Sequence, residues 1–153
     1  MANLHEIVQW CNQTLKVSEF KDYAPNGLQI EGTPEVNKIV CAVTASEDAI
    51  NAAIAQQADA LLVHHGYFWK GEAYPITGMR GNRIKKLIQN NISLIAYHLP
   101  LDSHPTLGNN AMIAQILGLD NIEALDPHER NPIGNIAGLL QIFRQNQRAS
   151  PGQ

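Results

Sequence analysis

Residues 37–65 read NKIVCAVTASEDAINAAIAQQADALLVHH, and their apolar spacing indicates the fold class. NKIVCAV, at 37–43, is a short apolar run that predicts a buried strand. SEDAINAAIAQQ, at 46–57, predicts a helix with Ser46 at its N-cap and acidic residues in its first turn. DALLVH, at 59–64, predicts the next buried strand. A strand, a helix and a second strand in this order are typical of a parallel βαβ unit.

The alternation of strand and helix continues along the chain. NRIKKLIQNN, at 82–91, predicts a helix, and ISLIAYH, at 92–98, predicts a third buried strand. NNAMIAQILGL, at 109–119, predicts a further helix. Strands this apolar avoid water on both faces, so we predict an α/β fold with a largely parallel central sheet and flanking helices.

Further elements are predicted before and after this alternating region. NLHEIVQWCNQTLK, at 3–16, predicts an amphipathic helix with a capping box, and 28–31 predicts an edge strand or an extended loop. IGNIAGLLQIF, at 133–143, predicts one more strand, whereas RQNQRASPGQ, at 144–153, is polar. We therefore expect a single α/β domain over residues 1–143 and a polar, disordered tail over residues 144–153.

The composition indicates an ordinary globular domain. The 153 residues are 44% hydrophobic and 16% charged, with a formal net charge of -3, which is unlike a disordered or fibrous protein. The 11 basic residues are scattered, and their longest cluster, RIKK at 83–86, fits the solvated face of a helix. We therefore expect no nucleic-acid partner.

The N-terminus and the cysteines favour a cytoplasmic protein. No apolar run reaches the roughly 18 residues of a membrane span, so we expect no membrane partner. His5, Glu6 and Gln9 interrupt the region where a signal peptide would be apolar. Cys11 and Cys41 have no C-x-x-C spacing, so we interpret both as packing residues in a reducing compartment.

Candidate ligands follow two of the predicted strands where each strand ends. His64 and His65 fall at the C-terminal end of the second strand, and His98 and Asp102 fall just beyond the end of the third. Ligands of α/β proteins gather at the carboxyl ends of such strands. Pro100 argues against one helical face for His98 and Asp102, so we expect a tight excursion that turns both side chains inward. The two loops can then converge on one site.

Three imidazoles and a carboxylate form a ligand set that suits zinc, iron, manganese or nickel. Adjacent residues in an extended chain point to opposite sides, so His64 and His65 fit two ions about 3.5 to 4 Å apart better than one. Asp102 can then bridge the two ions. Such a pair activates water and polarises an electrophile, which predicts metal-assisted hydrolysis.

Several side chains near these positions have more than one interpretation. A His-His pair alone is more often a surface or hydrogen-bonded loop feature. The second pair of candidate ligands, His98 and Asp102, is what favours metal binding. His104 is equally suited to a solvated loop and to holding Asp102 or a water. His5 and His128 are expected at the surface.

The loop 66–80 and the end of the first predicted strand also carry side chains with two interpretations. Tyr67, Phe68, Trp69 and Tyr74 can stack on a planar substrate or form a lid, but we favour an interface or core packing for them. For Thr44 and Ser46 we favour helix capping over a role in the site.

Four stretches carry a family resemblance. PNGLQIEG (25–32), DALLVHHGYFWKGE (59–72), IAYHLPLDSHPTLGNNA (95–111) and ILGL (116–119), in this order, resemble the NIF-three-like dinuclear metal-centre family, which is often described as GTP cyclohydrolase type-two-like. The resemblance runs from about residue 4 to about residue 120 and therefore covers the N-terminal part of the family fold.

The resemblance implies a metal-bridged α/β fold with two divalent ions (Fe, Zn or Mn). His64, His65 and Asp102 would hold the ions, with His98 as a further ligand or as the proton shuttle; we favour the ligand. It also implies a ring-shaped homo-oligomer, commonly a hexamer, and a hydrolase-like activity on a small purine-like or amide/amidine substrate.

This sequence differs from the family's chains in one respect. The family's chains continue into a second half that contributes a further His and Glu, and this sequence has no late H-x-x-x-E pattern. We therefore expect fewer protein ligands and weaker metal binding. The alternative functions are a non-catalytic scaffold, a regulatory or metal-handling ring protein, and a truncated inactive form.

Overall fold

The computed structural model describes residues 1–128 and 130–138. The chain divides into two compact units, Met1–Pro100 and Leu101–Gln153. The single domain expected over residues 1–143 stays a prediction, and the tail predicted at residues 144–153 lies outside the described residues. Within the described part, no helix is both long and apolar enough to cross a membrane.

The first unit contains most of the regular structure. Its helices are α1 (Leu4–Thr14), the short 3-10 helix η1 (Val17–Glu19), α2 (Glu47–Ala55) and α3 (Gly78–Gln89). Its strands are β1 (Ala2–Asn3), β2 (Gly27–Ile30), β3 (Glu35–Val36), β4 (Ile39–Thr44), β5 (Ala60–His65) and β6 (Ser93–Ala96). Helix α4 (Leu99–Ser103) begins in this unit and ends in the next.

The central sheet has four strands in the order β2-β6-β5-β4. Strands β4, β5 and β6 are parallel, and β2 pairs with β6 in the antiparallel direction. This confirms the predicted α/β fold with a largely parallel sheet and places residues 28–30 of the predicted 28–31 segment in the edge strand β2. Because Thr44 pairs with His65 and Val63 pairs with Ala96, the three parallel strands end at the same edge.

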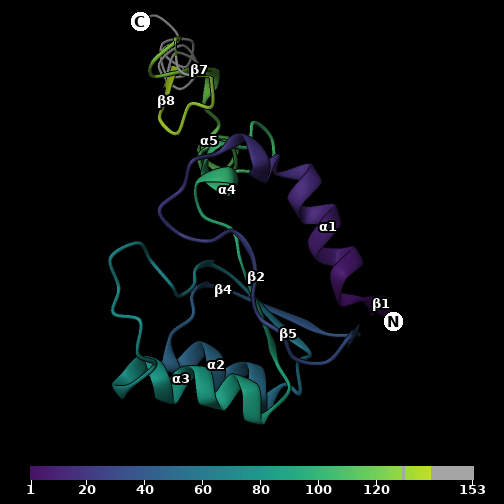
Figure 1. The fold of residues 1–153 in the computed structure, drawn as a ribbon. Coiled ribbons are helices and arrows are strands. Elements are labelled where there is room, and N and C mark those ends of the chain that lie inside the picture. Colours follow the sequence, from purple (N-terminus) through teal and green to yellow (C-terminus); the bar gives the residue numbers. More distant parts are fainter. Residues whose placement is uncertain (129, 139–153) are drawn as a thin grey trace, which may run out of the picture. The chain divides into compact units, whose positions relative to one another are not determined.

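Helices α2 and α3 lie side by side on one face of this sheet, and α1 lies on the other side (Figure 1). Ser46 caps α2 as predicted, because its hydroxyl accepts a hydrogen bond from the backbone N–H of Ala49 (3.1 Å). The core between the sheet and α2 and α3 is formed by Ile30, Ala45, Ile50, Ala53, Ala58, Leu61, Val63, Tyr67, Ile84, Leu87, Ile92, Leu94 and Ala96.

Strand β4 differs from the buried strand predicted at 37–43. Its side chains Val40 and Ala42 pack against the core, but Ile39, Cys41 and Val43 on the other face are exposed. The prediction of burial on both faces was wrong because β4 is an edge strand, and one apolar face is enough to anchor it. Cys41 is therefore a surface side chain instead of the packing residue we expected.

The segment after β6 also differs from its prediction. It forms the short helix α4, not an irregular excursion, with Pro100 as its second residue. Proline is tolerated in the first turn of a helix because the N–H groups there have no intrahelical acceptor. His98 precedes α4 and only Asp102 lies in it, so the two residues do not share one helical face, as expected, but the irregular excursion predicted for this segment was wrong.

The second unit is small and exposes many apolar side chains. It contains α5 (Asn109–Leu117) and the antiparallel strands β7 (Asp120–Ala124) and β8 (Asn135–Gly138). Strand β8 lies inside the strand predicted at 133–143, and residues 139–143 lie outside the described part. On α5, Ile113, Ile116 and Leu117 are all exposed.

Candidate metal centre

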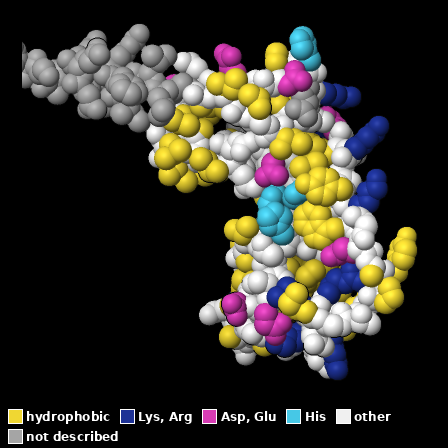
Figure 2. Space-filling view, turned by 90° about the vertical axis from the view of Figure 1, so that its left-hand side faces the viewer, with side chains coloured by type: hydrophobic (Ala, Val, Ile, Leu, Met, Phe, Trp, Pro, Cys, Tyr) yellow, Lys and Arg dark blue, Asp and Glu magenta, His cyan; other side chains and the backbone are white. Residues whose placement is uncertain are grey.

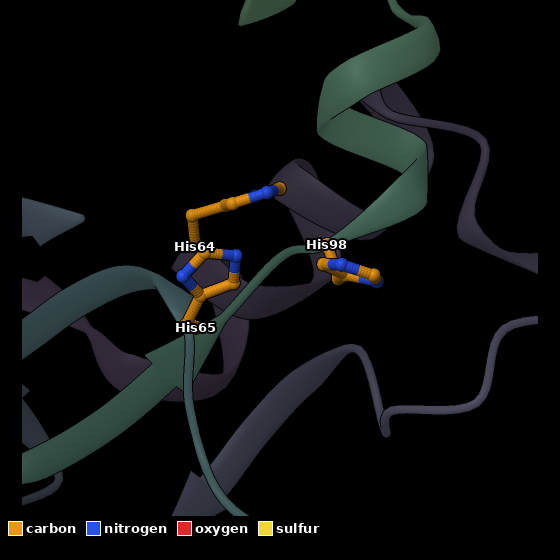
Figure 3. A group of neighbouring side chains, drawn as sticks. All are labelled: His64, His65 and His98. Carbon is orange, nitrogen blue, oxygen red and sulfur yellow. The ribbon is translucent and has the colours of Figure 1, made fainter. Parts of the chain in front are cut away.

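Three histidines gather at the carboxyl edge of the parallel strands. His64 and His65 are the last two residues of β5, and His98 follows β6 by two residues (Figure 3). One possible ligand atom of each histidine lies within 4.8 Å of those of the other two. The structure thus brings together three of the four side chains that the sequence predicted for a metal site.

The backbone determines the tautomer of His64. Its Nδ1 lies 2.9 Å from the carbonyl oxygen of Tyr97. A carbonyl oxygen only accepts hydrogen bonds, so Nδ1 carries the proton and donates it. The lone pair of the neutral ring is then on Nε2, which makes Nε2 the nitrogen that can coordinate a metal ion.

A carboxylate has the same effect on His98. Its Nδ1 lies 3.0 and 3.2 Å from the two carboxylate oxygens of Asp22. Asp22 also accepts hydrogen bonds from the backbone N–H groups of Leu99 (2.9 Å) and Ala24 (3.1 Å) and from the Asn26 amide (2.9 Å). His98 therefore presents Nε2 as its coordinating nitrogen as well.

Asp22 is charged in this environment. Its side chain is only 4% exposed, and this burial by itself raises the pKa of the carboxyl. The hydrogen bonds from Asn26, His98 and the two backbone N–H groups outweigh burial, so the pKa of Asp22 lies below its ordinary value. Asp22 is thus a buried anion that faces an imidazole N–H.

The Nδ1 of His65 lies beside a hydroxyl group, a weaker hydrogen-bond partner than the carboxylate beside His98. This Nδ1 lies 3.1 Å from the hydroxyl oxygen of Thr44, which both donates and accepts. For Thr44 the sequence favoured helix capping over a role in the site, but the pairing of β4 with β5 sets it beside His65. The rings of His64 and His65 are 4.5 Å apart between centroids, and those of His64 and His98 are 4.9 Å apart.

Aromatic side chains border the three imidazoles. The ring centroids of Trp69 and Tyr23 lie 5.0 and 5.1 Å from that of His98, both in edge-to-face arrangements. The backbone N–H of Lys70 donates to the carbonyl of Tyr23 (2.8 Å), which ties the two loops together. Figure 2 shows imidazole side chains at the surface with hydrophobic side chains beside them.

The other aromatic side chains of loop 66–80 have different surroundings. Tyr67 is in the core, where its hydroxyl donates to the carbonyl of Ala45 (2.6 Å), so core packing is confirmed for this residue. Phe68 and Tyr74 are exposed. The role of these two residues as a subunit contact stays a prediction.

The remaining predicted residues belong to other surroundings. Asp102 lies on α4 in the second unit, where one carboxylate oxygen accepts a hydrogen bond from the Asn109 amide (2.7 Å). Its role as a metal ligand stays a prediction. His104 accepts hydrogen bonds at Nδ1 from the backbone N–H groups of Leu107 (3.0 Å) and Thr106 (3.3 Å), so its ring organises its own loop.

Asp22 was missed in the sequence. It lies in a turn-forming segment, KDYAPNG at 21–27, where an aspartate is ordinary. Its partner His98 is 76 residues away in the chain, so no local spacing connects the two. The histidines expected at the surface are there: His128 is exposed, and His5 is exposed and lies 3.0 Å from Glu31.

Comparison with protein-family models shows which family the chain belongs to. The family model described as Duf34/NIF3 (NGG1p interacting factor 3) matches residues 2–150. This chain belongs to the Duf34/NIF3 family. The resemblance seen in the sequence is thereby confirmed.

Curated relatives of this Duf34/NIF3 chain carry a common name. A Haemophilus influenzae protein called "GTP cyclohydrolase 1 type 2 homolog" is 56% identical over 126 residues, which cover 82% of this chain and 50% of that protein. An Escherichia coli protein of the same name is 51% identical over 122 residues, which cover 80% of this chain and 49% of that protein. The chain spans about half the length of these relatives.

Solved structures agree with the family. A structure described as protein ybgI, of unknown function, has a TM-score of 0.79 and 49% identity, covering 82% of this chain and 51% of that one. TTHA1606 from Thermus thermophilus has a TM-score of 0.77 and 40% identity, covering 82% and 52%. HcgD from Methanocaldococcus jannaschii, at a TM-score of 0.76 and 22% identity over 96% and 60% of the two chains, shows the shared fold.

Proposed function

We propose that this Duf34/NIF3 chain holds divalent metal ions with His64, His65 and His98, and with Asp102 as a carboxylate ligand. The observation that supports this best is the grouping of three imidazoles whose Nδ1 atoms all lie beside hydrogen-bond partners from the protein. Metal-binding histidines characteristically use one ring nitrogen for such a partner and the other for the ion. The set suits two ions of Fe, Zn or Mn.

The proposed activity is metal-dependent hydrolysis of a small purine-like or amide/amidine substrate. Divalent ions, when bound, supply the Lewis-acid chemistry that activates water for hydrolysis. The chain's own residues hold and orient the ligand nitrogens, and Trp69 and Tyr23 form an aromatic border that keeps one side of His98 from water. The relatives' name, GTP cyclohydrolase 1 type 2 homolog, supports the purine-like part of this substrate class.

Metal content is the decisive experiment. The purified chain is reloaded with Fe, Mn or Zn, and bound metal per chain is measured by elemental analysis. We expect one to two ions per chain for the wild type, in line with the one- or two-ion sites such ligands form. The His64→Ala/His65→Ala variant should lose them, because it removes both ligands on β5.

A matched control removes two histidines elsewhere. The His5→Ala/His128→Ala variant also deletes two imidazoles, but both are exposed and outside the three-histidine group. It should keep the wild-type metal content. Equal metal content in both double variants would contradict the proposed centre and indicate non-specific binding.

Trp69 offers a second measurement. Its ring centroid lies 6.0 Å from that of His65, and the chain contains only one other tryptophan, Trp10. In a Trp10→Phe background, a paramagnetic ion such as Co²⁺ bound at the histidines should quench the fluorescence of Trp69. A titration without quenching would exclude binding at this place.

Turnover separates catalysis from a scaffold role. We expect GTP hydrolysis that requires added Mn, Fe or Zn and disappears in the His65→Ala variant. Hydrolysis that is insensitive to metal and to His65→Ala would contradict the hydrolase proposal. A metal-binding chain that turns over no GTP would favour the metal-handling or scaffold function instead.

A homo-oligomer, as a ring or hexamer, is part of the same proposal. The exposed apolar side chains Ile113, Ile116 and Leu117 of α5 support association with a second copy of the chain. Light scattering coupled to size-exclusion chromatography measures the mass directly. A monomer at all concentrations would contradict the ring. A cytoplasmic location likewise stays a prediction, to be tested by cell fractionation.

A further inference from the structure

The three histidines of the candidate centre have Nδ1 partners of different kinds. His64 faces a backbone carbonyl, His65 faces the Thr44 hydroxyl, and His98 faces the Asp22 carboxylate. A carboxylate is the strongest acceptor of the three and carries a full negative charge. It fixes the tautomer of its histidine and also makes the other ring nitrogen a better electron donor.

We propose that Asp22 is a positioning residue of the metal centre, which holds His98 in the Nδ1–H tautomer and strengthens Nε2 as a donor to a divalent ion. This role rests on the metal binding proposed above. Asp22 itself does not touch the ion in this proposal. It acts through the ring of His98.

The surroundings of Asp22 fit a fixed support. Four groups donate to its carboxylate, namely His98 Nδ1, the backbone N–H groups of Leu99 and Ala24, and the Asn26 amide. A carboxylate with this many donors has one orientation, so the ring it holds is fixed in direction too.

Asn26 adds a second attachment to the same histidine. Its side-chain oxygen accepts a hydrogen bond from the backbone N–H of His98 (2.7 Å), while its amide nitrogen donates to Asp22. The segment before β2 therefore holds both the backbone and the ring of His98. A support of this kind sets the position of a ligand before any ion arrives, which lowers the cost of binding.

The Asp22→Asn substitution tests the role with a minimal change of shape. It removes the charge and places an amide N–H₂ among groups that all donate, so the hold on His98 Nδ1 is weakened. Loss of such an outer partner typically lowers metal affinity by about 10- to 100-fold. We expect a decrease of this size for Co²⁺, measured by Trp69 quenching in the Trp10→Phe background.

Asp59→Asn is the matched control. The Asp59 carboxylate also accepts two backbone hydrogen bonds, from Asn37 (2.7 Å) and Lys38 (2.9 Å). It immediately precedes β5, so it lies at the opposite end of the strand from His64 and His65. The same chemical change there should leave Co²⁺ affinity within about twofold of the wild type, because distant surface changes have small effects.

A direct readout of the tautomer keeps the test independent of metal affinity. Long-range ¹H–¹⁵N NMR of the metal-free protein at about pH 8, above the ordinary pKa of histidine, distinguishes protonated Nδ1 from protonated Nε2. We expect His98 to be protonated at Nδ1 in the wild type and to show a mixed population in Asp22→Asn. A change that only loosened the fold would alter many signals and would not redistribute the His98 tautomers selectively.

The outcomes separate the two proposals. Wild-type His98 protonated at Nε2 would overturn the role of Asp22 even if the variant fails to fold. Equal Co²⁺ affinity of wild type and Asp22→Asn would overturn it as well. Absence of Co²⁺ binding by the wild type would instead overturn the metal centre itself, and the role of Asp22 with it. A selective loss of affinity and of the Nδ1–H tautomer supports both.

Discussion

Gly66 separates His65 from Tyr67, and its missing side chain leaves room for Gln29. The Gln29 side-chain oxygen accepts a hydrogen bond from the backbone N–H of Tyr67 (2.7 Å). A Cβ at position 66 would lie 2.2 Å from that oxygen and 2.8 Å from the Cβ of Ala96. The turn that follows the two histidines therefore requires glycine for reasons of space.

Gly66→Ala should destabilise the first unit by about 1–3 kcal/mol, the usual cost of overpacking. Urea unfolding measures the change. The Gln29→Ala background removes one of the two clashing groups, so the same substitution should cost less there. An equal cost in both backgrounds would show that Gln29 is not the group that excludes a side chain.

The two cysteines should differ in reactivity. Burial raises the pKa of the Cys11 thiol, and a hydrogen bond with Tyr97 lowers it only in part, whereas Cys41 is exposed on β4. Because the thiolate is the reactive form, and burial disfavours the thiolate of Cys11, iodoacetamide near pH 8 should alkylate Cys41 faster than Cys11.

Peptide mass spectrometry over time measures both cysteine rates in one sample. Raising the pH should accelerate the reaction of Cys11, because its thiolate forms at higher pH than that of an ordinary cysteine. In urea the two rates should converge. Equal rates in the folded protein would contradict the burial of Cys11.

At the scale of elements, local patterns predicted the type of each central segment but not its surroundings. Strands 59–64 and 92–98 and the helix at 46–57 were predicted correctly because their apolar spacing and caps are local properties. The exposed face of β4 depends on its position at the edge of the sheet, which no local pattern records. Helix α4 was missed because Pro100 was interpreted as a helix breaker instead of a first-turn residue.

A pair of identical substitutions tests the two faces of the sheet. Val43 on β4 is 69% exposed, whereas Val63 on β5 is 3% exposed and in the core. Val→Thr at position 43 should change the free energy of unfolding by no more than about 0.5 kcal/mol. At position 63 it buries a hydroxyl and should cost about 1–3 kcal/mol. Similar costs in urea unfolding would indicate that the outer face of β4 is covered in solution.

At the scale of the whole molecule, the sequence predicted the cluster of histidines because parallel strands bring their carboxyl ends to one edge. His64, His65 and His98 are together for this reason. The partners of their Nδ1 atoms could not be predicted in the same way. Asp22 reaches His98 from a loop, and the Tyr97 carbonyl, just past the end of β6, meets His64 on the neighbouring strand β5, so both contacts depend on the finished fold.

A bound ion should therefore stabilise the folded chain, since the unfolded chain has no preformed site. An ion present at about 100 times its dissociation constant adds about 2.7 kcal/mol. For a unit of roughly 100 residues, this raises the melting temperature by about 10 °C or more. Calorimetry with Zn or Mn, and with a chelator, measures the shift.

The variants already described decide where a stabilising ion binds. The His64→Ala/His65→Ala protein should melt at the same temperature with and without metal, because two of the clustered imidazoles are gone. The His5→Ala/His128→Ala protein should keep the full shift. A shift that survives in both would place the ion elsewhere in the chain. A shift lost in the first alone would show that the edge where β5 and β6 end couples metal binding to folding.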